Sequence, residues 1–360
     1  MHVYSVTPPS RPGEGPVPVP GAYRARVAAT ARAAEAAGWS GILVPHNLRE
    51  VDPWTVASYI GAVSPELTPL VAVQPSGTPP HTAAACAAAY AELYGRPLYF
   101  NLVAGARDDE MHSIGERLDH DGRYRRLREY AQVLRALLAG AEAELTGEHY
   151  TYRRLRLEPR AAVLAGCKVF IAGSSPQSVA LAVDEADVVV THPLPFERWR
   201  EESLDPLRRA GYRGELGIRI GIVSRESRAE ARRVANLRFP QTWLARQETV
   251  LKTGSRNHWA RDLATLAVER EAAEDGSDAA DPTDGTYWLG AFRSGRASAP
   301  FLVGSYQDVG AALGAYLRAG VGHVLLNGVE QEDHAHTGIA LEEAARTLDG
   351  IRDPRGNEHD

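Results

Sequence analysis

Short apolar runs alternate with longer amphipathic segments eight times along this chain. The first run is residues 3–6, and the last, residues 323–326, follows an amphipathic segment at 306–318. Each run has the length of a buried parallel strand, and each segment between runs can form a covering helix. Eight such units predict a (β/α)8 TIM barrel, because an open doubly wound sheet usually stops at about five or six strands.

The alternation gives a specific set of expected elements. The expected strands are 3–6, 41–44, 70–74, 98–103, 169–172, 188–190, 216–224 and 323–326. The expected helices are 22–38, 53–62, 81–94, 119–140, 176–185, 196–210 and 306–318. Two insertions interrupt the pattern. Residues 145–159 alternate with a period of two about a turn, which predicts a hairpin after the fourth helix. Residues 225–288 are expected to be irregular, with a mobile lid at about 240–285 over the C-terminal face of the barrel.

Length and charge limit the classes of protein that the chain can belong to. We expect one barrel domain over residues 1–350, followed by a polar tail at 351–360. A net charge of −6 gives no electrostatic footprint for nucleic acid or an anionic membrane. No targeting segment and no apolar run of about 20 residues is present, so a cytoplasmic protein is expected. Cys86 and Cys167 are expected to be buried, reduced and structural, and no metal site is predicted.

The segment from Pro97 to Tyr130 combines a strand, an acidic loop and a helix. Asn101 lies at the C-terminal end of the strand, where parallel α/β proteins place their chemistry. His120 and Tyr124 are four residues apart at the start of the helix, so both side chains project from one face. Both can donate a hydrogen bond to the same anion.

A second candidate anion site follows the fifth strand, in the sequence Ala-Gly-Ser-Ser-Pro at 172–176. Ser175 is a favoured N-cap residue and Pro176 suits the first helical turn. The free N–H groups of such a helix start bind phosphate readily. Alone, this pattern is more typical of an ordinary helix cap, because Ser-Pro caps are common. Together with His120 and Tyr124 of the preceding unit, it predicts a phosphate site.

Six segments, in this order, resemble the bacterial-luciferase-like flavin monooxygenases, and in particular the alkanesulfonate monooxygenase branch. They are LYFNLVAG, LDHDGRY, LTGEHYTY, FIAGSSPQSVALA, LGIRIGIVSRE and FLVGSYQDVGAALGAYLRAGVGHVLLNG, and the resemblance spans roughly residues 1–350. It implies a (β/α)8 barrel with insertions, reduced FMN as a diffusible co-substrate and O2 as the oxidant.

The resemblance also implies roles for individual residues. The family's phosphate-binding His and Tyr match His120 and Tyr124, and its Gly-Ser-Ser turn matches Gly173, Ser174 and Ser175. Residues implied to lie at the flavin ring are Gln74, Asn101 and, in the following loop, Ala104 and Gly105. The strand-seven Arg of the sulfonate enzymes, implicated in sulfonate binding and in stabilising the oxygen adduct of the flavin, matches Arg219.

Several substrate-site residues of the sulfonate enzymes are replaced in this chain. Their active-site Cys corresponds to Glu50, and the His two residues beyond the strand-seven Arg corresponds to Gly221. Their Tyr and His after strand eight correspond to Val329 and Gln331, and their mobile-loop Arg aligns near Gly295, one place from Arg296. A simple alkanesulfonate is therefore not the expected substrate.

Polar residues expected at the mouth of the barrel are His46, Glu50, His192, Arg219, Gln331 and His334. His46, His192 and Arg219 are the candidate catalytic residues, although a structurally bonded histidine is an equally good interpretation of His46 and of His192. Arg219 interrupts the apolar strand GIRIGIV, so its guanidinium should face a polar cavity and needs an anionic partner.

The function predicted from these observations is two-component oxygenation of a small organic substrate by reduced FMN and O2. A separate NAD(P)H:flavin reductase is the expected partner, because no G-x-G-x-x-G motif follows a strand and no Walker sequence is present. A homodimer or homotetramer is expected. Three alternatives stay open: an alkanesulfonate-type desulfonating monooxygenase, a deazaflavin-dependent dehydrogenase on the same barrel, and a non-catalytic flavin-binding protein.

Overall fold

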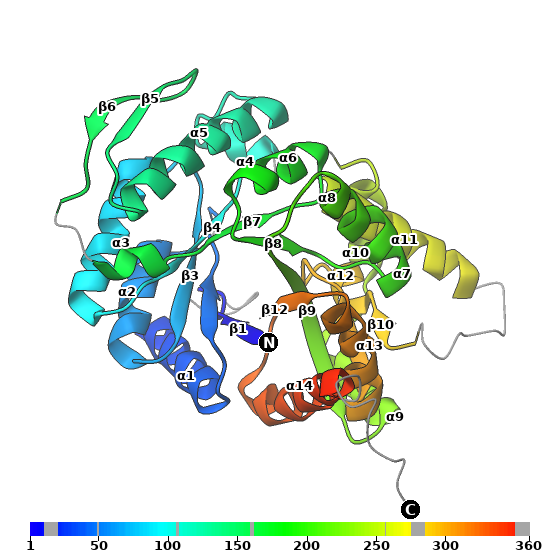
Figure 1. The fold of residues 1–360 in the computed structure, drawn as a ribbon. Helices are drawn as coiled ribbons and strands as arrows, with labels where there is room; N and C mark the ends of the chain where they lie inside the picture. Colours follow the sequence, from blue (N-terminus) through cyan, green and yellow to red (C-terminus); the bar gives the residue numbers. More distant parts are fainter. Residues whose placement is uncertain are drawn as a thin grey trace, which may run out of the picture. The chain divides into compact units, whose positions relative to one another are not determined.

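The computed structural model describes residues 1–10, 21–48, 50–105, 108–158, 162–255, 257–274 and 285–349. Its main sheet has the strand order β10-β11-β9-β12-β1-β2-β3-β4-β7-β8, with a further pairing between β9 and β8 (Figure 1). This topology, with helices between successive parallel strands, is the expected (β/α)8 TIM-barrel fold.

Most elements lie within a few residues of their expected positions. The strands are β1 (His2–Val6), β2 (Gly41–Val44), β3 (Thr68–Val73), β4 (Tyr99–Leu102), β5 (Ala143–Thr146), β6 (Thr151–Leu155), β7 (Val169–Ala172), β8 (Val188–Thr191), β9 (Glu215–Arg225), β10 (Tyr287–Trp288), β11 (Phe301–Ser305) and β12 (Val321–Leu326). The helices are α1 (Ala22–Ala36), α2 (Pro53–Val63), α3 (Pro80–Tyr94), α4 (Asp108–Ser113), α5 (His120–Leu138), α6 (Pro176–Glu185), α7 (Phe196–Trp199), α8 (Asp205–Arg209), α9 (Arg228–Arg238), α10 (Trp243–Lys252), α11 (His258–Glu274), α12 (Gly290–Arg293), α13 (Tyr306–Arg318) and α14 (His334–Asp349). The short helical turns are η1 (Ala162–Gly166), η2 (Arg200–Leu204) and η3 (Gln331–Asp333).

The chain divides into two compact units. Unit 1 comprises Met1–Val3, Thr191–Pro206 and the residues from 215 onward. Unit 2 comprises Tyr4–Val190 and Leu207–Gly214.

In unit 2, β2, β3, β4 and β7 pair in parallel, in that order. Their side chains are almost all buried, which explains why these strands are mostly apolar and do not alternate between apolar and polar residues. Asn101 in β4 lies opposite Ala72 of β3 and Phe170 of β7. The C-terminal ends of these three neighbouring strands therefore lie side by side, and the loops that follow them can form one site.

The expected hairpin after the fourth barrel helix is present as the antiparallel pair β5–β6 (Figure 1). Its turn is tied to α5 by Glu129. The Glu129 carboxylate accepts backbone N–H bonds of 2.8–2.9 Å from Glu148, His149 and Tyr150. An ionised carboxylate in such a ring of N–H donors is a strong acceptor, so the hairpin is anchored to the helix.

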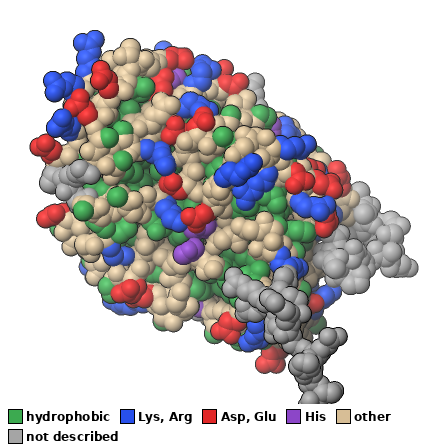
Figure 2. Space-filling model, in the orientation of Figure 1, with side chains coloured by type: hydrophobic (Ala, Val, Ile, Leu, Met, Phe, Trp, Pro, Cys, Tyr) green, Lys and Arg blue, Asp and Glu red, His purple; other side chains and the backbone are tan. Residues whose placement is uncertain are grey.

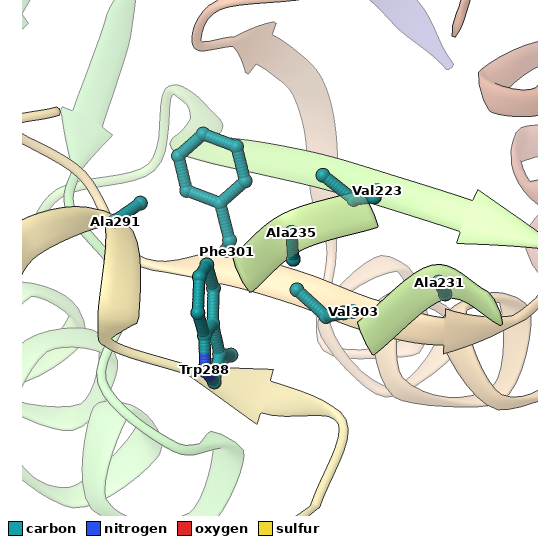
Figure 3. Packing of buried hydrophobic residues seen from close by; sticks show 7 residues of the cluster. All are labelled: Val223, Ala231, Ala235, Trp288, Ala291, Phe301 and Val303. Atoms are coloured by element: carbon teal, nitrogen blue, oxygen red, sulfur yellow. The ribbon is translucent and has the colours of Figure 1, made fainter. Parts of the chain in front are cut away.

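In unit 1, the long strand β9 pairs with two partners. Its first half pairs in parallel with β12, and its second half pairs in parallel with β11. Around the second half, a buried apolar cluster joins β9, α9, β10, α12 and β11 (Figure 3); its members are Val223, Ala231, Ala235, Trp288, Ala291, Phe301 and Val303. This cluster fixes the end of β9 beyond Arg219.

The segment between β9 and β10 is not irregular as expected. It contains the helices α9, α10 and α11, and the first two begin at the N-cap residues Ser227 and Thr242. The expectation was wrong because a Gly- and Asp-rich stretch further along suggested a loop throughout. Residues 256 and 275–284 of the expected lid, and the expected tail 351–360, lie outside the described residues.

Four smaller expectations also need correction. The acidic loop after Gly105 includes the short helix α4, and the helix expected at 196–210 consists of α7, the π-helical turn η2 and α8. The sequence pattern did not single out β11 or α14. Cys86 and Cys167 are unpaired but only partly buried, and Cys86 lines a cavity of about 560 Å³ between α2 and α3.

None of the described helices combines the length and the apolar composition that a membrane span requires. On the face shown in Figure 2, basic and acidic side chains are interspersed. This distribution agrees with the small net charge of the chain.

Candidate functional site

In unit 2, the expected flavin-ring residues lie at the ends of two neighbouring strands. Gln74 directly follows β3 and Asn101 lies in β4, and both side chains are buried. The Asn101 Oδ1 atom is buried and has no hydrogen-bond partner within the described part of the chain. A buried carbonyl oxygen without a partner costs free energy, and this atom is able to accept a hydrogen bond from a ligand N–H.

The Gln74 side chain is held by two contacts. Its Nε2 donates to Met111 Sδ at 2.8 Å, and the amide also hydrogen-bonds to His46, which follows β2. Burial lowers the pKa of His46, while Asp52 and the bond to Gln74 oppose this shift. His46 is therefore neutral at pH 7 and can serve as one donor and one acceptor.

Gly105, in the loop after β4, is required by its backbone and by its neighbours. Its φ is 93°, a conformation that favours glycine. A Cβ atom at this position would lie 2.4 Å from Met111 Sδ and 2.6 Å from Gln74 Nε2. The loop at Gly105 therefore packs closely over the Gln74 amide, while its implied role at the flavin ring stays a prediction.

The candidate phosphate site combines the N-terminus of α6 with Tyr124 from α5. The Ser175 hydroxyl caps α6 by accepting the Ser178 N–H at 3.2 Å, and Ser178 Oγ donates to the Ser175 carbonyl at 2.9 Å. Burial raises the pKa of the Tyr124 hydroxyl, and hydrogen bonds with Ser175 and Ser178 and the charge of Arg123 partly oppose this shift. Tyr124 therefore stays protonated and can donate to an anion at this helix start.

Gly173 allows this close approach of α5 and α6. Its φ is 138°, and a Cβ atom there would lie 2.9 Å from Ser178 Oγ and 3.3 Å from the Tyr124 hydroxyl. Ser174, between Gly173 and the cap residue, is partly exposed. The glycine thus lets the turn pack against Ser178 and the Tyr124 hydroxyl at the start of α6, a helix N-terminus of the kind that can bind an anion.

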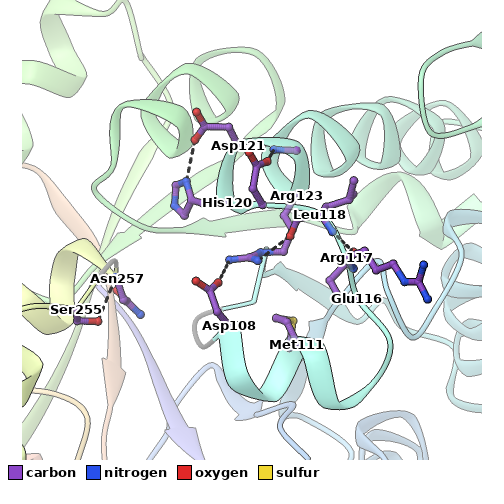
Figure 4. Close-up of polar contacts among 12 residues, drawn as sticks. Asp108, Met111, Glu116, Arg117, Leu118, His120, Asp121, Arg123, Ser255 and Asn257 are labelled. Carbon is purple, nitrogen blue, oxygen red and sulfur yellow. Dashed lines mark hydrogen bonds and ion pairs between the residues drawn. The ribbon is translucent and has the colours of Figure 1, made fainter.

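His120 is the first residue of α5, next to the N-cap Asp119. Its Nδ1 lies 3.0 Å from Asp121 Oδ1, and its ring centroid lies 4.9 Å from that of Tyr124. The buried Arg123 guanidinium donates to Asp108 at 2.9 Å and to the Leu118 carbonyl at 3.0 Å (Figure 4). Arg123 thus ties α4 to the start of α5 and keeps a positive charge near Tyr124.

In unit 1, His192 directly follows β8 and its ring stacks on Trp259 of α11. The centroids are 4.3 Å apart and the planes are inclined by 17°. Burial and, secondly, the charge of Arg219 lower the pKa of His192 to about 3. His192 is therefore neutral across the physiological range, and its buried Nε2 has no partner among the described residues.

Arg219 projects from β9 of unit 1 and, among the residues that the structure describes, has a single hydrogen-bonding side-chain partner. Its Nη2 donates to Asn327 Oδ1 at 3.0 Å, and its buried Nε has no partner in the described ranges. Burial lowers the pKa of Arg219 to about 10, so the guanidinium still carries its charge at pH 7. A desolvated guanidinium held by a neutral amide is available to an anion.

The structure explains two departures from the sulfonate enzymes. Gly221 lies opposite Phe301 of β11, and a Cβ atom at Gly221 would lie 2.3 Å from the Phe301 ring, so a larger side chain cannot be accommodated there. Glu50 accepts the Ser10 backbone N–H at 2.7 Å.

His334, expected at the mouth, is the buried first residue of α14, and its Nδ1 lies 3.1 Å from the Glu330 carbonyl. Gln331 begins η3 and Val329 precedes it.

Sequence reasoning missed three residues that shape these clusters. Met111 holds Gln74, Ser178 lies beside Tyr124, and Asn327 holds Arg219. Of these, only Asn327 had a usable signal in the sequence. It directly follows the eighth barrel strand, and residues at the C-terminal ends of barrel strands are often functional.

A model of the family described as luciferase-like monooxygenase matches residues 1–323. The TIM-barrel fold described above is consistent with this match. The chain belongs to the luciferase-like monooxygenase family and is therefore an enzyme of the monooxygenase class. Its finer placement in the alkanesulfonate branch stays a prediction.

Known relatives agree with this assignment. The chain is 33% identical over 330 residues to the 4-(gamma-L-glutamylamino)butanoyl-(BtrI acyl-carrier protein) monooxygenase BtrO of Niallia circulans, covering 90% of each sequence. The EDTA monooxygenase EmoA from Chelativorans sp. BNC1 has a similar fold, with a TM-score of 0.69, 15% identity and coverage of 96% of this chain and 94% of that one. The oxygenating constituent of 3,6-diketocamphane monooxygenase from Pseudomonas putida, solved in complex with FMN, also has a similar fold. Its TM-score is 0.67 and its identity is 16%, with coverage of 97% of this chain and 98% of that one.

Proposed function

We propose that this protein is the oxygenating component of a two-component system, which uses reduced FMN and O2 to oxygenate a small organic substrate. A separate NAD(P)H:flavin reductase supplies the reduced FMN. The observation that carries the proposal is the polar cluster at the start of α6, where Tyr124, Ser175 and Ser178 meet beside Gly173. Such a cluster suits a phosphomonoester, which FMN carries and riboflavin lacks.

In this proposal, the FMN phosphate binds to the free N–H groups of α6 and to the hydroxyls of Tyr124, Ser174 and Ser175, with His120 as a further donor. Several observations support it: the α6 dipole favours an anion at its N-terminus, Tyr124 stays protonated, and Arg123 adds positive charge nearby. Each hydrogen bond to a charged phosphate contributes about 1.5–3 kcal/mol.

The isoalloxazine ring is assigned to Gln74, Asn101, Ala104 and the neutral His46. The Asn101 Oδ1, which has no partner in the described part of the chain, suits a ring N–H donor, and the Met111 contact fixes the Gln74 amide in one orientation. FMN is preferred over other flavins because the phosphate cluster recognises a terminal phosphomonoester.

We assign to Arg219 the role of a fixed positive charge that stabilises negative charge during the reaction. When bound, reduced FMN supplies the electrons that activate O2, and negative charge develops as oxygen is reduced. A fixed guanidinium in a partly desolvated setting stabilises such charge better than water does. Neutral His192 adds no second positive charge beside Arg219 and offers its Nε2 to the substrate.

The substrate is proposed to be a small organic molecule other than a simple alkanesulfonate. Gly221 and Val329 stand where the sulfonate enzymes have polar side chains, and the ring of Phe301 leaves no room for one at position 221. The BtrO relative is named for an acyl group carried on a protein, so a carrier-linked acyl group is one substrate to be assayed.

The test is a stopped-flow experiment in which anaerobic reduced FMN, with and without the protein, is mixed with oxygenated buffer. We expect the protein to change the time course of flavin reoxidation, and a reduced deazaflavin to show no oxygen consumption. A time course identical to that of free reduced FMN at saturating protein would contradict the proposal. Oxygen uptake with a flavin reductase, FMN and candidate substrates then identifies the compound that is oxygenated.

A further inference from the structure

The backbone of unit 1 fixes Asn327 beside Arg219. Leu325 of β12 lies opposite Arg219 of β9, and the Asn327 N–H donates to the Ile220 carbonyl at 3.0 Å, extending the parallel ladder by one residue beyond β12. Gly328, with φ of 67°, then turns the chain away. The Asn327 backbone is therefore held in place independently of the side-chain bond to the guanidinium.

Arg219 differs from Arg225 and Arg238, two other half-buried arginines of this unit, in the charge of its partner. Arg225 and Arg238 both pair with the buried carboxylate of Asp333. Within the described residues, Arg219 pairs with no carboxylate, and it donates instead to the neutral amide oxygen of Asn327. An aspartate would have the same shape and the same acceptor position, so the amide at 327 leaves the positive charge of Arg219 uncompensated.

An uncompensated, partly desolvated cation is unfavourable unless an anion binds to it. The pKa of Arg219 is lowered by burial and is not raised by any acidic neighbour. The same charge also helps to lower the pKa of His192. The positive charge is therefore the dominant electrostatic feature of the His192–Arg219–Asn327 cluster.

We propose that Asn327 is a positioning residue, which orients the Arg219 guanidinium through a neutral acceptor and so keeps its full charge for an oxyanion. The oxyanion is the negative charge that develops during oxygenation or an anionic group of the substrate. This inference rests on the proposed function only for the identity of that oxyanion.

Two substitutions distinguish a charge-sparing role, in which Asn327 leaves the charge of Arg219 uncompensated, from a purely structural role. Asn327→Asp keeps the shape and strengthens the hydrogen bond, but it neutralises Arg219. Asn327→Ala removes the hydrogen bond and keeps the charge. A structural role predicts that Asn327→Ala is the more damaging change, whereas a charge-sparing role predicts that Asn327→Asp is. Asn236→Asp, at an exposed position of α9, is the matched control for one added negative charge.

The first readout is the binding of inorganic sulfate to the protein without flavin, measured by titration calorimetry at low ionic strength. All variants are compared in a Tyr124→Phe background, which weakens sulfate binding at the proposed phosphate site. We expect sulfate affinity to fall more than 10-fold in Asn327→Asp, to change about 2–5-fold in Asn327→Ala and to stay unchanged in Asn236→Asp. The second is the rate of reduced-FMN reoxidation, which should follow the same order. Urea unfolding verifies that each variant folds.

Lack of sulfate binding to the wild-type protein, or greater damage by Asn327→Ala than by Asn327→Asp, would overturn the proposal. Failure of the proposed function has a different signature. In that case the wild-type protein would not affect flavin reoxidation, while the order of the variants in sulfate binding would still hold.

Discussion

The indole ring of Trp259 lies on the imidazole ring of His192, with centroids 4.3 Å apart and planes inclined by 17°. His192 follows β8 and Trp259 is the second residue of α11, so the contact joins the helical insertion after β9 to another segment of unit 1, Thr191–Pro206. An aromatic ring in this position can shield the neutral imidazole from water. The expected role of this insertion as a lid stays a prediction, and Trp259 is the residue through which to test it.

Trp259→Ala should increase the hydrogen peroxide released per reduced FMN, because water would reach His192 and Arg219 more easily. An aromatic pair is worth about 0.5–1.5 kcal/mol, which corresponds to roughly a 2–10-fold effect. Trp259→Phe keeps an aromatic ring, so its hydrogen peroxide yield should stay close to that of the wild-type protein. Trp243→Ala is the control, since Trp243 is 71% exposed on α10. Equal peroxide yields from Trp259→Ala and the control would remove the shielding role.

The pKa of His192 predicts a pH dependence of stability. Burial lowers this pKa to about 3, from 6.5 for an unperturbed histidine. Between these two values the unfolded chain binds one more proton than the folded protein, so stability falls as the pH is lowered below about 6.5. His192→Gln removes the titrating imidazole, so it should remove the part of this fall in stability that is due to His192.

The measurement is the free energy of unfolding in urea at pH 7.5 and pH 5.0. We expect the decrease between the two pH values to be smaller in His192→Gln than in the wild-type protein. His81→Gln is a suitable control, because His81 lies in unit 2 on α3. If His192→Gln and the wild-type protein lost the same stability, a buried neutral His192 would be disproved.

Arg219→Ala should leave FMN binding nearly unchanged but lower the product formed per reduced FMN. Losing one preorganised charged donor typically costs about 10²–10³-fold in rate, and the electrons should then appear as hydrogen peroxide. Arg219→Lys should retain part of the activity, since it keeps the charge but loses the planar fork. Product yield per reduced FMN is the assay, and wild-type coupling in Arg219→Ala would show that the residue is only structural.

Local patterns predicted the parts of the candidate site that depend on near neighbours in sequence. The Ser175 cap followed from a Ser-Pro pair at a helix start, and His120 and Tyr124 share a helix face because they are four residues apart. Asn101 was placed at the end of β4 because its strand is a continuous apolar run. Each of these inferences needs only the geometry of one element.

Contacts between distant residues could not be predicted in this way. Arg219 and Asn327 are 108 positions apart, and their pairing depends on the β9–β12 register. The helices α10 and α11 were missed because their many charged residues blur the apolar periodicity, and the acidic stretch that follows suggested a loop. The need for glycine at 221 depends on Phe301, which comes from a strand that was not anticipated.

The most direct test of the account compares the affinities of the protein for FMN and for riboflavin, which lacks the phosphate. Both dissociation constants can be measured by flavin fluorescence for the wild-type protein, Tyr124→Phe and His120→Ala. If the α6 cluster binds the phosphate, the wild-type protein should prefer FMN by roughly 10-fold or more, because hydrogen bonds to a charged group contribute about 1.5–3 kcal/mol each. Tyr124→Phe should lose most of this preference by weakening FMN binding alone. Equal affinities of the wild-type protein for the two flavins, or an unchanged preference in both variants, would contradict the assignment of the phosphate site.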